Sequence, residues 1–276
     1  MKPYYIIFSD LDGTLLDHET YKHAEATEAL DLVKEREIPL ILCSSKTRAE
    51  MEECRKTLAL RDPFISENGA AIFFKKGSLD VMDVPFVKCG SYSVIELGIP
   101  YSTIKSCFAE IKAETHLQLL GFSEMSLAQV VEHTGLTVRE AELARARDYS
   151  EPFLFMEQQT SLKRLRKSAR RKGLNITRGG RFYHLTGDND KGKAVSILKK
   201  LYEQKARPLI SIGLGDSLND FSMLENVEMP VLVKKKTGKY ESWTSRKEIL
   251  YAPDIGPKGW NRAVLDILRH RRTALT

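Results

Sequence analysis

The chain contains little cysteine, and the spacing of the few cysteines excludes the two structural uses that this residue usually has. Four cysteines occur among 276 residues. They stand far apart, at Cys43, Cys54, Cys89 and Cys107, and no pair has the spacing of a zinc-binding motif. The same pattern argues against a disulfide framework. We therefore expect the four to be small packing residues.

Long apolar runs, internal repeats and low-complexity segments are missing as well. No hydrophobic run approaches the roughly 18 residues that a membrane helix needs, so we expect no membrane partner. Met1 is followed almost at once by an apolar run, Tyr4–Ser9, that is predicted to be a core strand, and we expect no cleaved leader. The contents of 42% hydrophobic and 29% charged residues are typical of a globular enzyme. We expect a cytoplasmic protein that is a monomer or a homodimer.

Positive charge exceeds negative charge, and much of the excess lies in one segment. The 43 Lys and Arg residues outnumber the 37 Asp and Glu residues, which gives a net charge of +6. Residues 163–172 are strongly basic, and a nucleic-acid-binding patch is one interpretation. Leu162, Leu165 and Ala169 recur at spacings of three and four, which favours the solvated face of an amphipathic helix. We therefore expect no nucleic-acid partner, and the charge favours a small anionic substrate.

The order of the expected elements indicates two units. Apolar strands alternate with helices in residues 4–74 and again after residue 192, a pattern typical of a mostly parallel sheet covered on both faces. The region between mixes helices with strands, the latter expected at 91–97, 151–157 and 174–185. We predict an α/β fold: a Rossmann-like, doubly wound core formed by residues 1–84 and 187–276, interrupted by an α+β cap at 85–186.

Two carboxylates stand one residue apart where the first strand ends. Asp10 and Asp12 would repel each other by about 4 kcal/mol at an effective dielectric near 20, so a cation or a proton must accompany them. A second acidic loop, with Asp216 and Asp220, follows the apolar run 209–214. Because parallel strands end at one edge of a sheet, we expect the two loops to meet. Oxygen ligands without cysteine or paired histidine favour Mg²⁺.

Two further polar positions are expected at the same edge. Ser44 follows the expected strand 38–43, where its hydroxyl and nearby backbone amides can hold a phosphate oxygen. Lys191 begins a predicted helix, where its ammonium can neutralise a phosphoryl group. Alone, the serine could be a helix cap and the lysine a surface residue. Beside the two acidic loops, they indicate phosphoryl transfer.

Four segments of the chain resemble, in order along the sequence, the four motifs of the haloacid dehalogenase-like phosphohydrolases. They are the DLDGT run at 10–14, Ser44, Lys191 and the GDSLND run at 215–220. The insertion between Ser44 and Lys191 lies where type IIB (C2) caps of that superfamily occur. Five further strings are similar to the mannosyl-3-phosphoglycerate phosphatase group: CSSKT at 43–47, SENGA at 66–70, RFYH at 181–184, GLGD at 213–216 and GPKGW at 256–260.

The resemblance implies roles for the acidic residues. Asp10 would be the nucleophile that forms an aspartyl-phosphate. Asp12 would protonate the leaving alkoxide and then activate water. Asp216 would complete the Mg²⁺ site with Asp10 and the backbone carbonyl of Asp12, while Asn219 and Asp220 would orient that shell.

The resemblance also implies a substrate. Beside the catalytic Ser44 and Lys191, it assigns substrate binding to Ser45, Lys46, Glu67, Asn68, Arg181, His184 and Lys258. The expected reaction is Mg²⁺-dependent hydrolysis of mannosyl-3-phosphoglycerate to mannosylglycerate and phosphate. The alternatives are a phosphatase for another sugar phosphate, such as glucosyl-3-phosphoglycerate, and a phosphosugar mutase of the same fold. A basic nucleic-acid-binding protein is the alternative of a different class.

Overall fold

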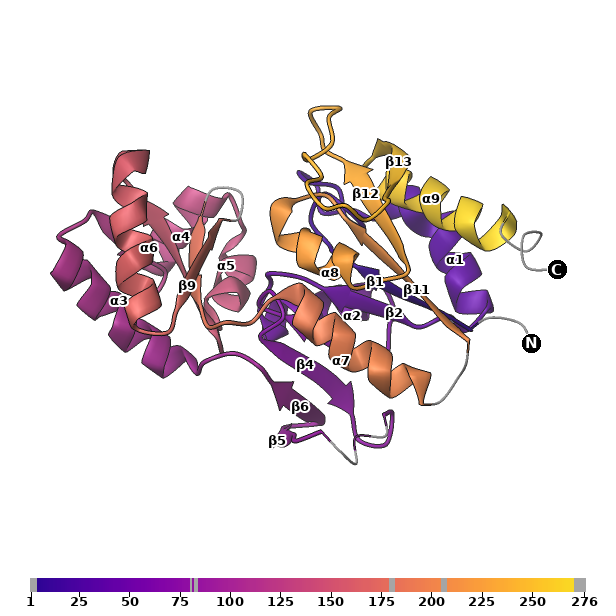
Figure 1. The fold of residues 1–276 in the computed structure, drawn as a ribbon, viewed down its shortest axis with the longest axis horizontal. Coiled ribbons are helices and arrows are strands. Elements are labelled where there is room, and N and C mark those ends of the chain that lie inside the picture. Colours follow the sequence, from indigo (N-terminus) through magenta and orange to yellow (C-terminus); the bar gives the residue numbers. More distant parts are fainter. Residues whose placement is uncertain (1–3, 80, 82–83, 179–181, 205–207, 271–276) are drawn as a thin grey trace.

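The computed structural model describes residues 4–79, 81, 84–178, 182–204 and 208–270, and two β-sheets organise them (Figure 1). The order of strands across the larger sheet is β13 (Leu250–Ile255), β12 (Met229–Lys234), β11 (Leu209–Gly215), β1 (Tyr4–Ser9), β2 (Leu40–Cys43), β3 (Phe64–Ser66), β4 (Ala71–Lys75), β6 (Tyr92–Glu96) and β5 (Val87–Cys89). The smaller sheet has the order β7 (Leu119–Gly121), β8 (Ser150–Phe155), β10 (Tyr183–Thr186) and β9 (Asn175–Arg178).

The strands from β13 to β3 are parallel to one another, whereas β4, β6 and β5 continue the sheet in antiparallel pairs. In the central strand β1, the side chains of Ile6, Ile7 and Phe8 are fully buried. A strand that is apolar on both faces must be covered on both faces. The predicted α/β core is therefore confirmed.

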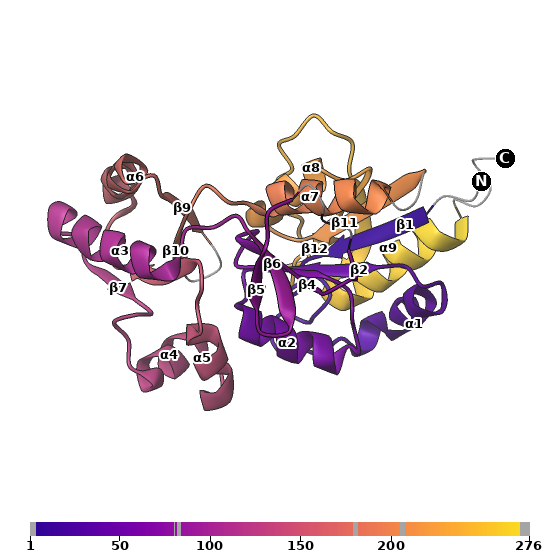
Figure 2. The ribbon, with the colours of Figure 1, turned by 90° about the horizontal axis from the view of Figure 1, so that it is seen from below.

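Helices cover both faces of the larger sheet (Figure 2). One face carries α1 (Thr27–Glu35), α2 (Arg48–Thr57) and α9 (Gly256–His270), and the other carries α7 (Lys191–Glu203) and α8 (Phe221–Glu225). Short 3₁₀ helices precede α1, α6 and α8: η1 (Ala24–Ala26), η2 (Gln159–Ser161) and η3 (Leu218–Asp220). Val33, Met51 and Trp260 pack in the first layer, while Leu198 and Met223 pack in the second.

The smaller sheet is antiparallel throughout and is also covered by helices. One face carries α3 (Tyr101–Thr115) and α6 (Leu162–Arg171), and α4 (Leu127–Thr134) and α5 (Val138–Arg145) pack on the other. The basic segment 163–172 forms most of α6, and Leu162, Leu165 and Ala169 are buried. The prediction of an amphipathic helix is confirmed.

The structure differs from two expectations, one about a strand and one about where the cap begins. The single strand expected at 174–185 is a hairpin, in which β9 and β10 pair in antiparallel fashion. Strands β5 and β6 join the larger sheet through β4, where Val94 and Ile95 pair with Phe73 and Ile72. The boundary expected between residues 84 and 85 therefore lies too early, because apolar cross-strand pairs extend the larger sheet to Glu96.

Candidate active site

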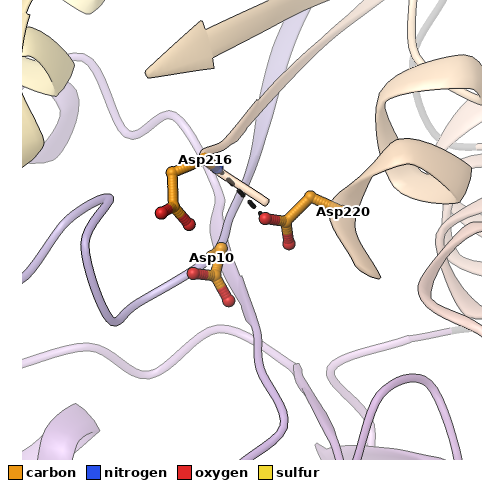
Figure 3. Close-up of side chains that lie close together, drawn as sticks. All are labelled: Asp10, Asp216 and Asp220. Carbon is orange, nitrogen blue, oxygen red and sulfur yellow. Dashed lines mark hydrogen bonds between the residues drawn. The ribbon is translucent and has the colours of Figure 1, made fainter. Parts of the chain in front are cut away.

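The ends of neighbouring parallel strands bring the acidic loops together. Asp10 follows the last residue of β1, and Asp216 follows the last residue of β11, its parallel neighbour. Asp220 returns to the same point from η3. Figure 3 shows the three side chains close together, and one oxygen of each lies within 4.8 Å of the others. The predicted meeting of the two loops is confirmed.

Local packing fixes the second acidic loop. Asp220 accepts hydrogen bonds through Oδ2 from the backbone N–H groups of Asp216 (3.1 Å) and Ser217 (3.0 Å). A Cβ atom on Gly215 would lie 2.4 Å from the Cβ of Asp220, so only glycine fits there. One oxygen of Asp220 therefore holds the loop and leaves Oδ1 to face the site.

Lys191 lies between two of the carboxylates. It is the first residue of α7, and its Nζ is 2.6 Å from both Asp10 Oδ1 and Asp220 Oδ1. The lysine side chain is fully buried. Burial opposes its charge, but the carboxylates of Asp10 and Asp220 outweigh burial and raise the pKa of Lys191 above its usual range. The ammonium is held charged at the centre of the site.

The carboxylates keep an excess of negative charge despite this lysine. Burial, followed by the charge of Asp220, raises the pKa of Asp10 well above its usual range. The same two causes raise the pKa of Asp216 to about 7. Close, buried carboxylate oxygens suit a small, hard divalent cation, which would offset their repulsion. The donor set thus fits Mg²⁺, with Asp10 and Asp216 as the residues to hold it.

Asp12 is not part of this cluster through its side chain. Its Oδ2 is 2.9 Å from Lys46 Nζ, and its carboxylate is 33% exposed. Among the contacts of the described residues, its Oδ1 is buried without a hydrogen-bond partner. Asp12 and Asp10 line the same cavity, and the unpartnered oxygen leaves Asp12 with capacity for a further hydrogen bond, as a proton donor to a leaving group needs.

A cavity of about 640 Å³ opens over these groups. Six residues predicted to act in or near the site line it: Asp10, Asp12, Ser44, Ser45, Asp216 and Asn219. Ser44 is buried, and its Oγ accepts a hydrogen bond from the backbone N–H of Lys46 (3.3 Å). The structure thus brings together the residues of the four motifs, with Lys191 beneath the cavity.

Three cations on the cavity wall extend the predicted set. Arg178 reaches the cavity from β9 of the smaller sheet, and Lys235 and Lys236 reach it from the loop after β12. Lys235 also pairs with Glu241 at 2.5 Å. Sequence reasoning missed both lysines, although they follow an apolar strand parallel to β11 and so come to the same edge of the sheet.

The remaining predicted substrate-binding residues are dispersed. Arg181 lies outside the described residues. His184, on β10, is buried, and burial together with the charge of Arg147 lowers its pKa to about 3. Lys258 is exposed in the first turn of α9, 3.8 Å from Asp254. The described part of the cavity wall includes neither His184 nor Lys258.

Glu67 and Asn68 have other partners than the expected substrate. Glu67 is fully buried, and its carboxylate accepts hydrogen bonds from the backbone N–H groups of Asp148 (2.8 Å) and Tyr149 (3.2 Å). Asn68 Oδ1 accepts a hydrogen bond from the side chain of Asn219 (3.1 Å). Both side chains thus make contacts between loops, and their binding of substrate stays a prediction.

Known proteins are similar to this chain in sequence and in fold. The chain is 46% identical over 266 residues to a glucosyl-3-phosphoglycerate/mannosyl-3-phosphoglycerate phosphatase of Methanococcoides burtonii, covering 96% of this chain and 97% of that protein. It is 41% identical to a protein of the same name from Persephonella marina, covering 95% and 97%. A solved phosphatase of the haloalkanoate superfamily from Bacteroides thetaiotaomicron has a TM-score of 0.68 at 18% identity, covering 96% and 95%.

The sequence profile of one family matches most of the chain. The match spans residues 7–241, which include both acidic loops, Ser44 and Lys191. The protein belongs to the haloacid dehalogenase-like hydrolases.

Proposed function

We propose that this protein is an Mg²⁺-dependent phosphomonoesterase that hydrolyses mannosyl-3-phosphoglycerate, with glucosyl-3-phosphoglycerate as the second candidate substrate. The observation that carries the proposal is the buried Asp10 carboxylate held 2.6 Å from the Lys191 ammonium under a cavity lined with cations. The names of the relatives at 46% and 41% identity support both glycosyl groups.

The proposed reaction assigns one role to each of three residues, Lys191, Asp10 and Asp12. Lys191 fixes one oxygen of Asp10 and offsets the charge that would otherwise repel a phosphate. Asp10 attacks phosphorus and forms the aspartyl-phosphate, and the bond to the substrate oxygen breaks. Asp12 gives that oxygen a proton. It then takes a proton from water, which attacks phosphorus, frees Asp10 and releases inorganic phosphate.

A divalent cation held by Asp10 and Asp216 would supply further positive charge to the phosphoryl group when bound. Ser44 supports the same group from the opposite loop, through its hydroxyl and the N-terminal end of α2. These core groups hold the phosphoryl group but do not distinguish one phosphate ester from another.

Recognition of the leaving group would come from the rest of the cavity. We propose that the unit built on the smaller sheet is a specificity cap, and that Arg178, Lys235 and Lys236 bind the glycerate carboxylate. Guanidinium and ammonium groups pair well with a carboxylate. A substrate with phosphate and carboxylate groups on one glycerate unit matches a cavity with these three cations on its wall and the Lys191 ammonium bonded to Asp10.

In the part of the chain that the structure describes, no helix has the length and apolar character needed to cross a membrane. The cytoplasmic location, the monomeric or dimeric state and the absence of a nucleic-acid partner stay predictions.

The test is a phosphate-release assay with Mg²⁺ across mannosyl- and glucosyl-3-phosphoglycerate, free 3-phosphoglycerate and simple hexose phosphates. We expect kcat/KM to be highest for a glycosyl-3-phosphoglycerate among these substrates, and we expect no activity in the Asp10→Asn variant. A preference for simple hexose phosphates would overturn the substrate, and conversion to an isomeric phosphate without phosphate release would indicate a mutase.

A further inference from the structure

The loop that carries Glu67 has an unusual backbone. Glu67, Asn68 and Gly69 have φ angles of 45°, 56° and 88°, so three successive residues lie in the left-handed region. Only the last is glycine, and a Cβ atom there would lie 2.0 Å from the carbonyl oxygen of Asp190. Non-glycine residues adopt this region only when their surroundings hold them there, and such strain collects at functional sites.

The surroundings that hold this loop are the catalytic loops themselves. The N–H of Asn68 donates to the carbonyl of Ser44 (2.9 Å), and the N–H of Glu67 donates to the carbonyl of Lys46 (3.0 Å). The side chain of Asn219, in the second acidic loop, donates to Asn68. The loop after β3 is therefore joined to two of the segments that form the floor of the cavity.

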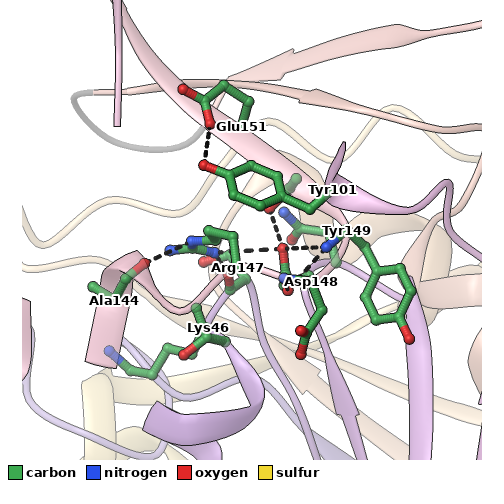
Figure 4. A network of polar contacts seen from close by, with 12 residues as sticks. Lys46, Tyr101, Ala144, Arg147, Asp148, Tyr149 and Glu151 are labelled. Carbon is green, nitrogen blue, oxygen red and sulfur yellow. Dashed lines mark hydrogen bonds and ion pairs between the residues drawn. The ribbon is translucent and has the colours of Figure 1, made fainter. Parts of the chain in front are cut away.

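The Glu67 side chain points the other way, into the cap. Its carboxylate accepts hydrogen bonds from the backbone N–H groups of Asp148 and Tyr149 and from the hydroxyl of Ser150, the first residue of β8. Asp148 and Tyr149 lie in the polar network of Figure 4, beside Arg147. These donors are more than 80 residues away in sequence. Glu67 thus joins the cap to the catalytic loops by a single fully buried side chain.

Arg147 adds a second connection beside the first. Its Nη1 donates to the carbonyl of Ser45 (2.8 Å), its Nε donates to the carbonyl of Ala144 in α5 (2.8 Å), and Nη1 lies 4.0 Å from Glu67 Oε2. The arginine side chain is only 6% exposed. The segment that Glu67 holds is therefore also bonded to the loop that would hold the phosphoryl group.

One of the two chain crossings between the sheets runs past the same point. The backbone N–H groups of Leu97 and Gly98 both donate to the carbonyl of Ala70 at 2.8 Å. A Cβ atom on Gly98 would lie 2.8 Å from the Cβ of Ala70 and 2.9 Å from the Cβ of Tyr149. The contacts of Glu67 thus lie at the root of the cap, where a small displacement changes the position of the whole cap.

We propose that Glu67 is a positioning residue that clamps the cap segment 148–150 to the loop carrying Ser44, so that the position of the cap and the geometry of the phosphoryl site are set together. This inference rests on the proposed function and adds a coupling within that site. A substrate whose leaving group binds the cap needs the clamp. A small aryl phosphate, held by the core loops alone, needs it much less.

The chain offers a matched control for this clamp. Glu151 is also fully buried, and its carboxylate accepts hydrogen bonds from Tyr101 Oη (2.5 Å) and the N–H of Ser123 (2.9 Å). All three residues belong to the cap unit. Glu67→Gln and Glu151→Gln therefore make the same change in equally buried carboxylates, and only the first alters a contact between cap and core.

The experiment measures kcat and KM for mannosyl-3-phosphoglycerate and para-nitrophenyl phosphate in the wild type and both variants, beside their thermal unfolding. Glu67→Gln should lower kcat for the glycosyl substrate by about tenfold or more, because small misplacements of reacting groups lower the rate strongly. The kcat for the aryl phosphate should change little. Glu151→Gln should change the ratio between the two substrates far less. Equal losses on both substrates in Glu67→Gln would make the residue merely structural.

Amide hydrogen exchange separates this inference from the substrate assignment, since it needs no substrate. Glu67→Gln should speed exchange both in residues 148–150 and in the catalytic loop 44–47, whereas Glu151→Gln should leave 44–47 unchanged. Faster exchange in the cap segment alone would refute the coupling even if the substrate is correct. Should Glu67→Gln fail to fold, Ser150→Ala removes one donor to the clamp and should give the same pattern at smaller amplitude.

Discussion

Buried carboxylates occur in two regions of this protein, and their partners differ. At the root of the cap, Glu67 accepts hydrogen bonds from two backbone N–H groups and a hydroxyl. At the edge of the larger sheet, Asp10 shares one ammonium with Asp220 and faces Asp216. Glu67, Asp10 and Asp220 are all buried. The difference shows that burial alone does not distinguish a structural acid from a chemical one.

What distinguishes them is the supply of hydrogen-bond donors. A carboxylate whose lone pairs are taken by fixed donors stabilises the fold and has little capacity left for a ligand. A carboxylate surrounded by other carboxylates is short of positive charge, and a cation or a phosphoryl group can meet that need. We therefore expect removal of a carboxylate charge to destabilise the fold at Glu67 but not at Asp10.

The largest expected effect is on turnover in the acidic region. Asp10→Asn should lower phosphate release by several orders of magnitude, because the amide cannot act as the nucleophile. The protein should stay folded, since the change removes one of three crowded negative charges. Assays at saturating Mg²⁺ with thermal unfolding as the control would check both points. A variant that keeps a tenth of the wild-type rate would exclude Asp10 as the nucleophile.

Metal removal should have the next largest effect. Chelation should abolish activity and Mg²⁺ should restore it, with Ca²⁺ a poor substitute because its coordination shell is larger and looser. Binding should also stabilise the fold by about 3 kcal/mol at a hundredfold excess over Kd. Asp216→Ala should reduce the Mg²⁺-induced rise in Tm, whereas Glu151→Gln should not. Full activity in excess chelator would contradict the metal site.

The acidic region was largely predictable from the sequence, whereas the root of the cap was not. An apolar run followed by Asp10, and another followed by Asp216, suffice to predict a meeting at one sheet edge, since parallel strands end together. The partners of Glu67 lie more than 80 residues away on an element whose docking no local pattern encodes. Strand β5 was missed for a similar reason, because its exposed residues carry no apolar alternation.

A smaller effect is expected from the cavity wall, where positive charge is placed for recognition. Lys235→Met should lower kcat/KM for a glycosyl-3-phosphoglycerate by about tenfold, as expected for a lost ion pair, and should affect para-nitrophenyl phosphate much less. Lys239→Met is the control, because Lys239 is exposed in the same loop. If the two variants changed kcat/KM equally for both substrates, Lys235 would have no role in substrate recognition.

The last expected effect is on stability rather than on activity, and it concerns pH and the cap side of the comparison. His184 has a folded-state pKa of about 3, lowered by burial and by Arg147 from a usual value of 6.5. The folded protein therefore favours the neutral ring, and stability is lost as pH falls below 6.5, where the unfolded chain gains a proton that the folded chain does not. By pH 5 the loss should be about 2 kcal/mol. Urea unfolding of the wild type and His184→Gln at pH 7.5 and pH 5 would measure it. The variant should lose less stability between the two pH values, and an identical loss would show that His184 is protonated in the folded protein.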